Sequence, residues 1–545
     1  MPVNNRGRSA FIAALLLVAV HFIFIIKYFQ PAISTLDSHG YHVQARQIAR
    51  TGKTYIVPES RIQFIGYTWN KDKNGRYFTI WPPGFPLLLA IVYKAICPEA
   101  ALLVNPVMAS LSLLALFLVC RAWIGSGWGL LAAAMTAMTP FVNLHAHYGY
   151  SHISVIFFLI WGLFFLTRWI ETESSVFAFV CGLLLGVIPS IRLLEGIFIP
   201  AFFVFAWLKS NRTNDIRYGL VPFLLGAAAP VTMLVIYNSL TFDTLFKSGY
   251  SLVGYNLTAI FRWDYFSRNS VALHQKLLAE GGGFTFALGT VGIFALCTRR
   301  NTWKRGLFLA LLVFPITVFY MFYFYRPDPN SMRFFLPTFP IYSIAAVWLL
   351  SLLAENRRGA AAALSIAIIV LTLFWGLPQS IDKMERLERR NKAVAEITQM
   401  IAEHAEKGSV VIAPEPLCAQ LDFLGRWRVV NVSKLRNRRP DEYDGVTGGT
   451  ITRAFERDVR KWAGGRKVYW LMRERDINRI VRRIPKSGEL TPVAWKRIPP
   501  VIYLGESRRP DDRHHPRRAD DDSFRARGEF DIAEGAEYRL DLMYD

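Results

Sequence analysis

Cysteine is scarce in this sequence and does not form a framework. The five cysteines are scattered, and most lie in apolar segments, at Cys97, Cys120, Cys181, Cys297 and Cys418. Disulfide scaffolds, redox motifs and zinc sites need cysteines at short, regular spacings, which this sequence lacks. Charged residues are also few, at 19% of 545 residues, and the chain has no internal repeat. These absences exclude a disulfide framework and direct attention to the apolar residues.

Apolar residues make up 52% of the chain, the mean hydropathy is +0.25, and many runs carry no charge. Such a composition is typical of a polytopic membrane protein rather than a large soluble enzyme. The net charge of +22 comes with basic residues in the loops between the apolar runs. Lysine and arginine in short loops mark the cytoplasmic side of a membrane protein. The positive charge therefore indicates membrane orientation rather than nucleic-acid binding.

The first apolar run, from about Ala10 to Phe29, follows Arg6 and Arg8 and has no small-residue cleavage site at its end. We interpret it as an uncleaved signal anchor. The hydropathy predicts about eleven transmembrane helices in all, each an apolar run of near-spanning length. They are expected near residues 10–29, 101–122, 128–142, 150–170, 176–191, 194–208, 220–240, 284–297, 306–325, 334–353 and 360–377. The short apolar segment Gly84–Ile96, which follows Pro82 and Pro83, is interpreted as a re-entrant or interfacial helix.

The basic loops set the expected orientation. If Gly84–Ile96 does not cross, all of them fall on one side of the membrane, which the positive-inside rule makes the cytoplasm. The N-terminus is then cytoplasmic. The loop 30–83, the loops 238–283 and 326–333, and everything after Leu377 face the outside.

The composition changes to a charged, soluble type after Leu377. We expect a transmembrane domain over residues 1–379, an exported α/β domain over 380–506, and a charged, disordered tail over 507–545. The α/β domain should contain a helix over Ile381–Glu406 and strands at Ser409–Ala413 and Arg466–Leu471. A metal site at His514 and His515 in the tail is the less favoured interpretation of that segment.

Asp37 is the residue of greatest interest, because it directly follows the first span. Apolar residues then recur at helical spacing as far as Gly52, at Tyr41, Ala45, Ile48 and Ala49. One interpretation makes Asp37 the N-cap or N-terminal turn residue of an interfacial helix. The other makes it a catalytic base or metal ligand that faces a cavity, since an acid at the membrane boundary is costly without a role or a partner. The pattern alone leaves both open.

Other polar residues are expected on the same side of the membrane as Asp37. His39 lies beside it, and Trp81 in the Trp-Pro-Pro-Gly-Phe-Pro segment could stack on a sugar or act as an ordinary interfacial anchor. His147 and His152 lie in a polar stretch at the start of the span near residue 150. Histidines there could bind phosphate, a hydroxyl group or a metal, or could be interfacial residues with no ligand.

Three arginines are candidates for binding a phosphate, because a guanidinium group can donate two parallel hydrogen bonds to one. Arg192 has Glu195 close by in sequence, so the two could simply neutralise each other. Arg262 lies in the long loop 238–283. Arg333 has only Asp328 near it in sequence, which favours a phosphate partner for Arg333.

These motifs together resemble those of a known family, the C-type membrane glycosyltransferases. The resemblance covers about residues 11–377 and is greatest to the family 39 group, bacterial relatives of protein mannosyltransferases and of the aminoarabinose transferase that modifies lipid A. The motifs that carry it are Asp37-x-x-x-Tyr41-x-x-x-Ala45-x-x-Ile48-Ala49-x-x-Gly52, Pro82-Pro83-Gly84-x-Pro86-Leu-Leu-Leu and Arg333-Phe-Phe-Leu-Pro-x-x-Pro340. The family uses polyprenyl-phosphate sugars, and Asp37 matches its first-loop acid. Many relatives carry a second acid where this chain has Ser151 and His152, so a divalent metal is left open.

The resemblance implies a multi-pass enzyme of the bacterial inner membrane. It would transfer a sugar from a polyprenyl-phosphate donor to lipid A, another glycan or a protein, with Asp37 as general base and cations such as Arg333 or Arg192 at the leaving phosphate. The alternative is a transporter or flippase of a lipid-linked substrate. Charged residues in the middle of the spans and inverted repeats would indicate a transporter. The spans here have almost no charge at their centres, which favours the enzyme.

Overall fold

The computed structural model describes residues 5–209, 213–245, 247–253, 261–280, 282–323, 329–431, 446–447, 450–451, 453–473, 490–496 and 502–507. The chain forms two compact units. Unit 1 comprises Met1–Val57 and Gly66–Asn391, and unit 2 comprises Pro58–Ile65 and Lys392–Asp545. The domain boundary expected at residue 380 falls inside the helix Leu377–His404. Of the tail expected over 507–545, Ser507 ends a strand, and residues 508–545 lie outside the described residues.

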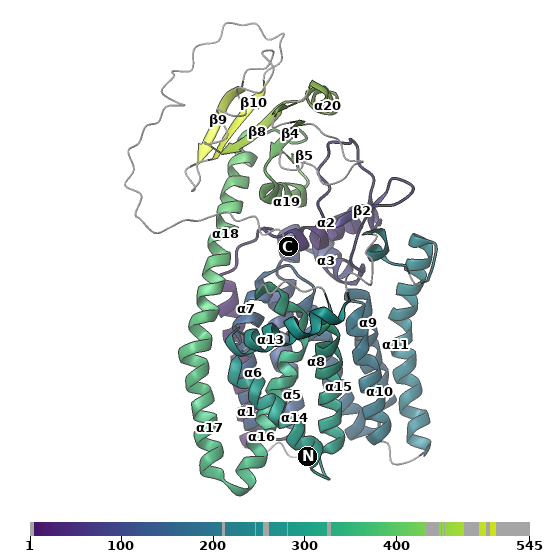
Figure 1. Ribbon diagram of the computed structural model, residues 1–545, viewed down its shortest axis with the longest axis vertical. Coiled ribbons are helices and arrows are strands. Elements are labelled where there is room, and N and C mark those ends of the chain that lie inside the picture. Colours follow the sequence, from purple (N-terminus) through teal and green to yellow (C-terminus); the bar gives the residue numbers. More distant parts are fainter. Residues whose placement is uncertain are drawn as a thin grey trace. The chain divides into compact units, whose positions relative to one another are not determined.

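Unit 1 is built from long apolar helices, because a helix satisfies its own backbone hydrogen bonds in a lipid environment. The helices with bounds near the expected spans are α1 (Asn5–Lys27), α5 (Val104–Trp123), α6 (Ser126–Ala137), α8 (His152–Thr172), α9 (Ser175–Ile191), α10 (Phe198–Lys209), α11 (Thr213–Phe242), α14 (Gly283–Thr298), α15 (Trp303–Met321), α16 (Phe339–Asn356) and α17 (Arg358–Leu371). Figure 1 shows most of them running roughly parallel to one another. This confirms the predicted helical, multi-span architecture.

Not every expected span is a full-length helix. Among the described residues, seven helices are long and apolar enough to cross a membrane, or eight if a bent pair forms one span. That pair is the segment Trp263–Leu278 and α14, which meet at an angle of 113°. α9 and α10 are shorter, with 17 and 12 residues. The sequence count of about eleven spans thus includes helices that are too short to be counted as spans by length.

Several elements break or join the expected spans. The segment expected near 128–142 is split into α6 and α7 (Pro140–His147), because Pro140 cannot continue a helix from the preceding turn. α17 instead continues through a π-turn, η4 (Thr372–Gly376), into the long helix α18 (Leu377–His404). The remaining short elements of unit 1 are α4 (Pro98–Ala101), η1 (Leu194–Ile197), η2 (Gly249–Val253), α13 (Trp263–Glu280) and η3 (Pro329–Thr338).

The first long loop, residues 30–83, is folded. It contains α2 (Leu36–Thr51) and a three-stranded antiparallel sheet of order β1-β3-β2, formed by Tyr55–Ile56, Tyr77–Thr79 and Trp69–Lys71. The short helix α3 (Gly84–Ala95) follows and packs against α2. In Figure 1, α2 and α3 lie at the end of the helical bundle that is opposite the N-terminus of the chain.

The structure decides between the two positions that the sequence left open for Asp37 at the start of α2. The N-cap residue is Thr35, and Asp37 lies in the first turn of the helix, the second of those positions. Gly52 is the C-cap, and its backbone N–H donates to the carbonyl of Ile48, as the sequence predicted. Asp37 is therefore favourably placed for the helix dipole, but it is not the cap.

Unit 2 contains a five-stranded mixed sheet of order β5-β4-β8-β10-β9. The expected strands appear as β4 (Val410–Ala413) and β8 (Val468–Arg473), and β5 (Arg428–Asn431), β9 (Leu490–Lys496) and β10 (Ile502–Ser507) complete the sheet. β4 is parallel to both neighbours and is fully buried, as its continuous apolar sequence requires. α19 (Glu415–Leu424), α20 (Arg453–Ala463) and a short pair, β6 (Val446–Thr447) and β7 (Thr450–Ile451), complete the described part of the unit.

Candidate functional site

Asp37 and Arg333 form an ion pair, although they lie far apart in the sequence. Asp37 Oδ2 is 3.1 Å from an Nη atom of Arg333, and the two side chains are 28% and 17% exposed. The first turn of α2 carries the carboxylate, and η3 carries the guanidinium. The acidic partner of Arg333 is thus a residue that lies far from it in the sequence, and its role as a phosphate ligand stays a prediction. The pair remains partly open to solvent, so a ligand can reach it.

Aromatic rings hold the Arg333 guanidinium in place. Its central carbon lies 5.2 Å from the centroid of the Tyr150 ring and 5.3 Å from that of Phe334. Phe334 in turn stacks on Tyr320 of α15, with centroids 4.8 Å apart and planes 18° from parallel. A guanidinium over an aromatic face is attracted by the ring quadrupole, so these rings fix the orientation of Arg333.

A second arginine meets the same aromatic ring. The guanidinium carbon of Arg192 lies 5.5 Å from the Phe334 centroid, and Arg192 donates a 3.3 Å hydrogen bond to the Tyr320 hydroxyl. Its Nε is 2.5 Å from Oε1 of Glu195, so the ion pair that the sequence suggested is present. Glu195 is 0% exposed, and its Oε2 has no hydrogen-bond partner within the described residues. Two guanidinium groups, each with an acidic partner, therefore converge on Phe334.

Two buried histidines lie beside this pair of arginines. The ring of His152 is 6.0 Å from that of Phe334 and 6.2 Å from that of His145. His152 is 2% exposed, and both of its ring nitrogens lack a hydrogen-bond partner in the described part of the chain. His145 donates from Nδ1 to the carbonyl of Phe141, and its buried Nε2 has no such partner there. Unsatisfied buried nitrogens are costly, which makes these edges candidates for ligand contacts.

Trp81 and His39 are used in packing around α2. Trp81 is 8% exposed and stacks on Tyr41, with centroids 4.3 Å apart. The Tyr41 hydroxyl lies 2.9 Å from Ser151 Oγ, within hydrogen-bonding distance. His39 is 1% exposed and lies against Gly66. The sugar-stacking role of Trp81 stays a prediction, and its burial favours the structural role.

The other two predicted residues, Arg262 and His147, have other partners. The side chain of Arg262 forms an ion pair with Asp264 and lies over the ring of Tyr265, both at the start of α13. Its backbone N–H donates to the carbonyl of Phe322. His147 is half-buried, with its ring 6.3 Å from that of Phe29.

Sequence reasoning missed the aromatic part of the site. Phe334 follows Arg333 directly, and Tyr150 lies in the histidine-rich stretch, so both were adjacent to recognised motifs. Tyr320 lies in an apolar span, where a tyrosine gives no signal of its own. Its role depends on packing against η3, which only the tertiary structure shows.

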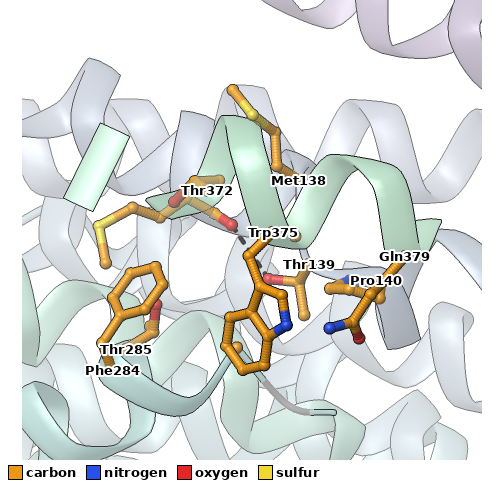
Figure 2. Close-up of a pocket in the computed structure, with 11 residues that line it drawn as sticks. Met138, Thr139, Pro140, Phe284, Thr285, Thr372, Trp375 and Gln379 are labelled. Carbon is orange, nitrogen blue, oxygen red and sulfur yellow. Dashed lines mark hydrogen bonds between the residues drawn. The ribbon is translucent and has the colours of Figure 1, made fainter. Parts of the chain in front are cut away.

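No three His, Cys, Asp or Glu residues among those described gather as a metal site would require. A small pocket lies elsewhere, where α6 and α14 meet η4. Figure 2 shows Trp375 in this pocket, together with Thr139, Phe284 and Gln379. None of its lining residues belongs to the Asp37–Arg333 site. The site described above is therefore the stronger candidate for chemistry.

The fold and the site together define a class: a helical, multi-span protein whose first long loop places an acid beside a late-span arginine. No family model matches the sequence, and no curated protein matches it at the level of sequence. The structure is similar to the crystal structure of ArnT from Cupriavidus metallidurans bound to undecaprenyl phosphate. The TM-score is 0.57 at 14% sequence identity, over 90% of this chain and 97% of that chain.

Crystal structures of the Archaeoglobus fulgidus oligosaccharyltransferase also match. The apo form has a TM-score of 0.47 at 12% identity, over 85% of this chain and 70% of that one. The complex with zinc and sulfate has a TM-score of 0.48 at 11% identity, over 89% and 72%. The likeness to ArnT shows that this chain has the C-type membrane glycosyltransferase fold, as its motifs predicted.

Proposed function

We propose that this chain is a membrane glycosyltransferase that transfers a sugar from a polyprenyl-phosphate donor to an acceptor hydroxyl or amine. The observation that carries the proposal is the Asp37–Arg333 ion pair beside a second arginine on the Phe334 ring. It supplies a carboxylate that can accept a proton and two cations that can hold a phosphate. Those are the groups that this transfer needs.

In the proposed reaction, the acceptor oxygen or nitrogen attacks the anomeric carbon of the sugar and gives its proton to Asp37. The bond from the anomeric carbon to the phosphate oxygen breaks on the opposite face, so the configuration inverts. Oδ2 of Asp37 is held by Arg333, and we assign the acceptor proton to Oδ1. A carboxylate has lone pairs for both interactions.

The polyprenyl phosphate leaves as an anion, so it requires cations rather than a general acid. Arg333 and Arg192 suit this role because aromatic contacts already fix both guanidinium groups. We place the buried nitrogens of His152 at the phosphate or at a sugar hydroxyl, since they lie beside the same ring. The likeness to a protein crystallised with undecaprenyl phosphate supports a lipid phosphate of this class.

The distribution of basic residues supports an orientation in which the N-terminus is cytoplasmic and the Asp37 site lies on the outer face. We therefore place the reaction on the outer face of a bacterial inner membrane. The acceptor classes in the proposal are lipid A, another envelope glycan and a protein.

The decisive experiment replaces Asp37 with Asn. As the general base, Asp37 cannot be replaced by an amide, so we expect transfer from a radiolabelled polyprenyl-phosphate sugar to a membrane extract to fall by about a hundredfold or more at normal protein abundance. Asp37→Glu should recover little, because displacing the carboxylate by about an ångström costs on the order of a hundredfold in rate. Asp382→Asn is the matched control, since Asp382 is an exposed aspartate that pairs with Arg386 on α18.

Near-normal transfer by the Asp37→Asn protein would contradict the base assignment. The flippase alternative gives a different result. In that case, wild-type protein in vesicles moves the labelled lipid between leaflets and transfers no sugar.

A further inference from the structure

Three basic side chains gather at one end of the helical bundle of unit 1. Lys304 and Arg305 lie in the first turn of α15, and Lys209 is the last residue of α10, which packs against α15. The ammonium group of Lys304 donates a hydrogen bond to the carbonyl of Leu208, the residue before Lys209. In Figure 1, these helix ends lie at the end of the bundle where the N-terminus is, opposite α2. The three residues, here called the basic cluster, are therefore separate from the Asp37 site.

Two tryptophan rings hold the side chain of Arg305. Its guanidinium carbon lies 5.2 Å from the centroid of the Trp348 ring and 5.7 Å from that of Trp123. The Trp123 indole is itself fixed, because its N–H donates a 3.0 Å hydrogen bond to the hydroxyl of Thr167. The rings attract the cation but accept none of its hydrogen bonds in the guanidinium plane. No described residue accepts a hydrogen bond from the Arg305 side chain, so its N–H donors are available to a ligand.

The charges of the basic cluster oppose one another. The positive charges of Lys304 and Arg305 both act on Lys209. Within the part of the chain that the structure describes, none of the three forms an ion pair with a carboxylate. The two cations of α15 also lie at the positive end of the helix dipole, where a negative charge is favoured instead. Like charges that converge without a counterion raise the energy of the folded protein, so the basic cluster favours the binding of an anion.

Exposed tryptophans place the basic cluster at the level of the lipid headgroups. Trp303 directly precedes Lys304 and is 38% exposed, and Trp207 lies in the last turn of α10 and is 54% exposed. Tryptophan is enriched where membrane helices meet the headgroups. The basic loops predict that this end of the bundle faces the cytoplasm, and the cytoplasmic leaflet carries anionic lipids. The anion within reach at this depth is therefore the phosphate of a lipid headgroup.

We infer that the basic cluster binds the headgroup phosphate of an anionic phospholipid. Arg305 presents the edge of its guanidinium group to two phosphate oxygens, and Lys209 and Lys304 neutralise the remaining charge. A zwitterionic lipid fits less well, because it brings its own ammonium group to three cations. The inference does not depend on the proposed sugar transfer, and its test uses no sugar donor.

The test compares two lipids on the purified full-length protein in detergent. Wild type is titrated with phosphatidylglycerol or with phosphatidylcholine, and bound lipid is counted by native mass spectrometry. We expect the tightest phosphatidylglycerol to bind about tenfold or more tightly than phosphatidylcholine. Arg305→Gln should weaken phosphatidylglycerol binding roughly fivefold, and Arg305→Gln combined with Lys209→Gln roughly twenty-five-fold. Arg168→Gln is the matched control and should not change the affinity, since Arg168 at the end of α8 already pairs with Glu171 at 2.7 Å.

Thermal unfolding supplies a second measurement in which each variant is its own reference. A ligand that binds only the folded state stabilises it, so phosphatidylglycerol should raise the apparent Tm of wild type more than phosphatidylcholine does. This difference between the two lipids should disappear in the double variant. Because the two lipids are compared within one variant, the result holds even where the substitutions themselves lower the Tm.

Three results would overturn the inference. One is equal affinity of wild type and the double variant for phosphatidylglycerol, and another is equal affinity of wild type for the two lipids. The third is displacement of phosphatidylglycerol by an equal concentration of sodium phosphate, which would show that the basic cluster takes a soluble anion rather than a lipid.

Discussion

The carboxylate of Asp37 and the guanidinium of Arg333 lie 3.1 Å apart and form an ion pair. Such a pair keeps the carboxylate oriented and the cation in the site. In the proposed reaction, the donor phosphate would meet a guanidinium group that already lies over the rings of Tyr150 and Phe334. The arrangement is preorganised, which is the property that makes electrostatic stabilisation effective.

Two substitutions at Arg333 distinguish the effect of its positive charge from the effect of its planar shape. Lysine keeps the positive charge but loses the planar fork and the aromatic stacking, so Arg333→Lys should bind a polyprenyl-phosphate sugar more weakly than wild type, and Arg333→Ala more weakly still. A hydrogen bond to a charged group contributes about 1.5–3 kcal/mol, so we expect Kd to rise by roughly tenfold or more in the alanine variant. Titration of purified protein with labelled donor measures this, and unchanged affinity in both variants contradicts the assignment.

His42 predicts how stability depends on pH. Burial lowers the pKa of His42 to about 4, against an opposing hydrogen bond from its ring to the Ser38 carbonyl, and the neighbouring His39 lowers it further. The unfolded chain takes up a proton near pH 6.5, whereas folded His42 does not until about pH 4. His42 therefore does not reduce the free energy of unfolding above pH 6.5. As the pH falls from 6.5 towards 4, the free energy of unfolding decreases, because only the unfolded chain binds a proton at His42.

We expect His42→Gln to reduce this pH dependence. The difference in unfolding free energy between pH 7.5 and pH 4.5 should shrink by up to about 3 kcal/mol, since each pKa unit corresponds to about 1.4 kcal/mol. Apparent Tm values in detergent at the two pH values measure it. An identical shift in wild type and variant would show that other groups account for the acid sensitivity.

At the scale of elements, η3 joins the two arginines. Phe334 contacts Arg192, Arg333 and Tyr320 through one ring, so η3 sets the distance between the two cations. The apolar spans beneath it, α15 and α16, both contact η3 and give it a rigid base. The position of the proposed phosphate site thus depends on helix packing rather than on the loop alone.

Phe334→Leu tests this arrangement because it keeps an apolar side chain and removes the ring. Each cation–π contact is worth about 0.5–2 kcal/mol, so donor affinity should fall by roughly threefold to thirtyfold without loss of protein. Phe374→Leu is the control, since Phe374 is 77% exposed on η4 and lies outside the site. Equal donor affinity in the two variants would remove Phe334 from the site.

At the scale of the whole molecule, the basic loops predict that the C-terminal domain is outside the cytoplasm. Protease added to intact spheroplasts should therefore remove a C-terminal tag, while a tag at the N-terminus stays protected. A C-terminal tag that is cut only after the membrane is permeabilised would reverse the orientation and move the proposed reaction to the cytoplasmic face.

The sequence by itself determined the class of fold, because hydropathy is a local property. Runs of apolar residues specify helices in lipid, and the continuous apolar strand Val410–Ala413 specifies a buried strand of an α/β domain. The motifs around Asp37 and Arg333 also identified the two residues that the structure brings together. Each motif is a short stretch of sequence, so each could be recognised before its partner was known.

Only the tertiary structure decided which of these residues meet. The partner of Arg333 is Asp37 rather than a sequence neighbour, and Tyr320 reaches the site from the middle of an apolar run. The docking of Pro58–Ile65 on the C-terminal sheet was equally hidden, because Phe64 and Val429 are joined by a backbone hydrogen bond that any sequence could make. Contacts between distant segments depend on how helices and strands pack, and packing depends on the shape of the whole surface rather than on any local pattern.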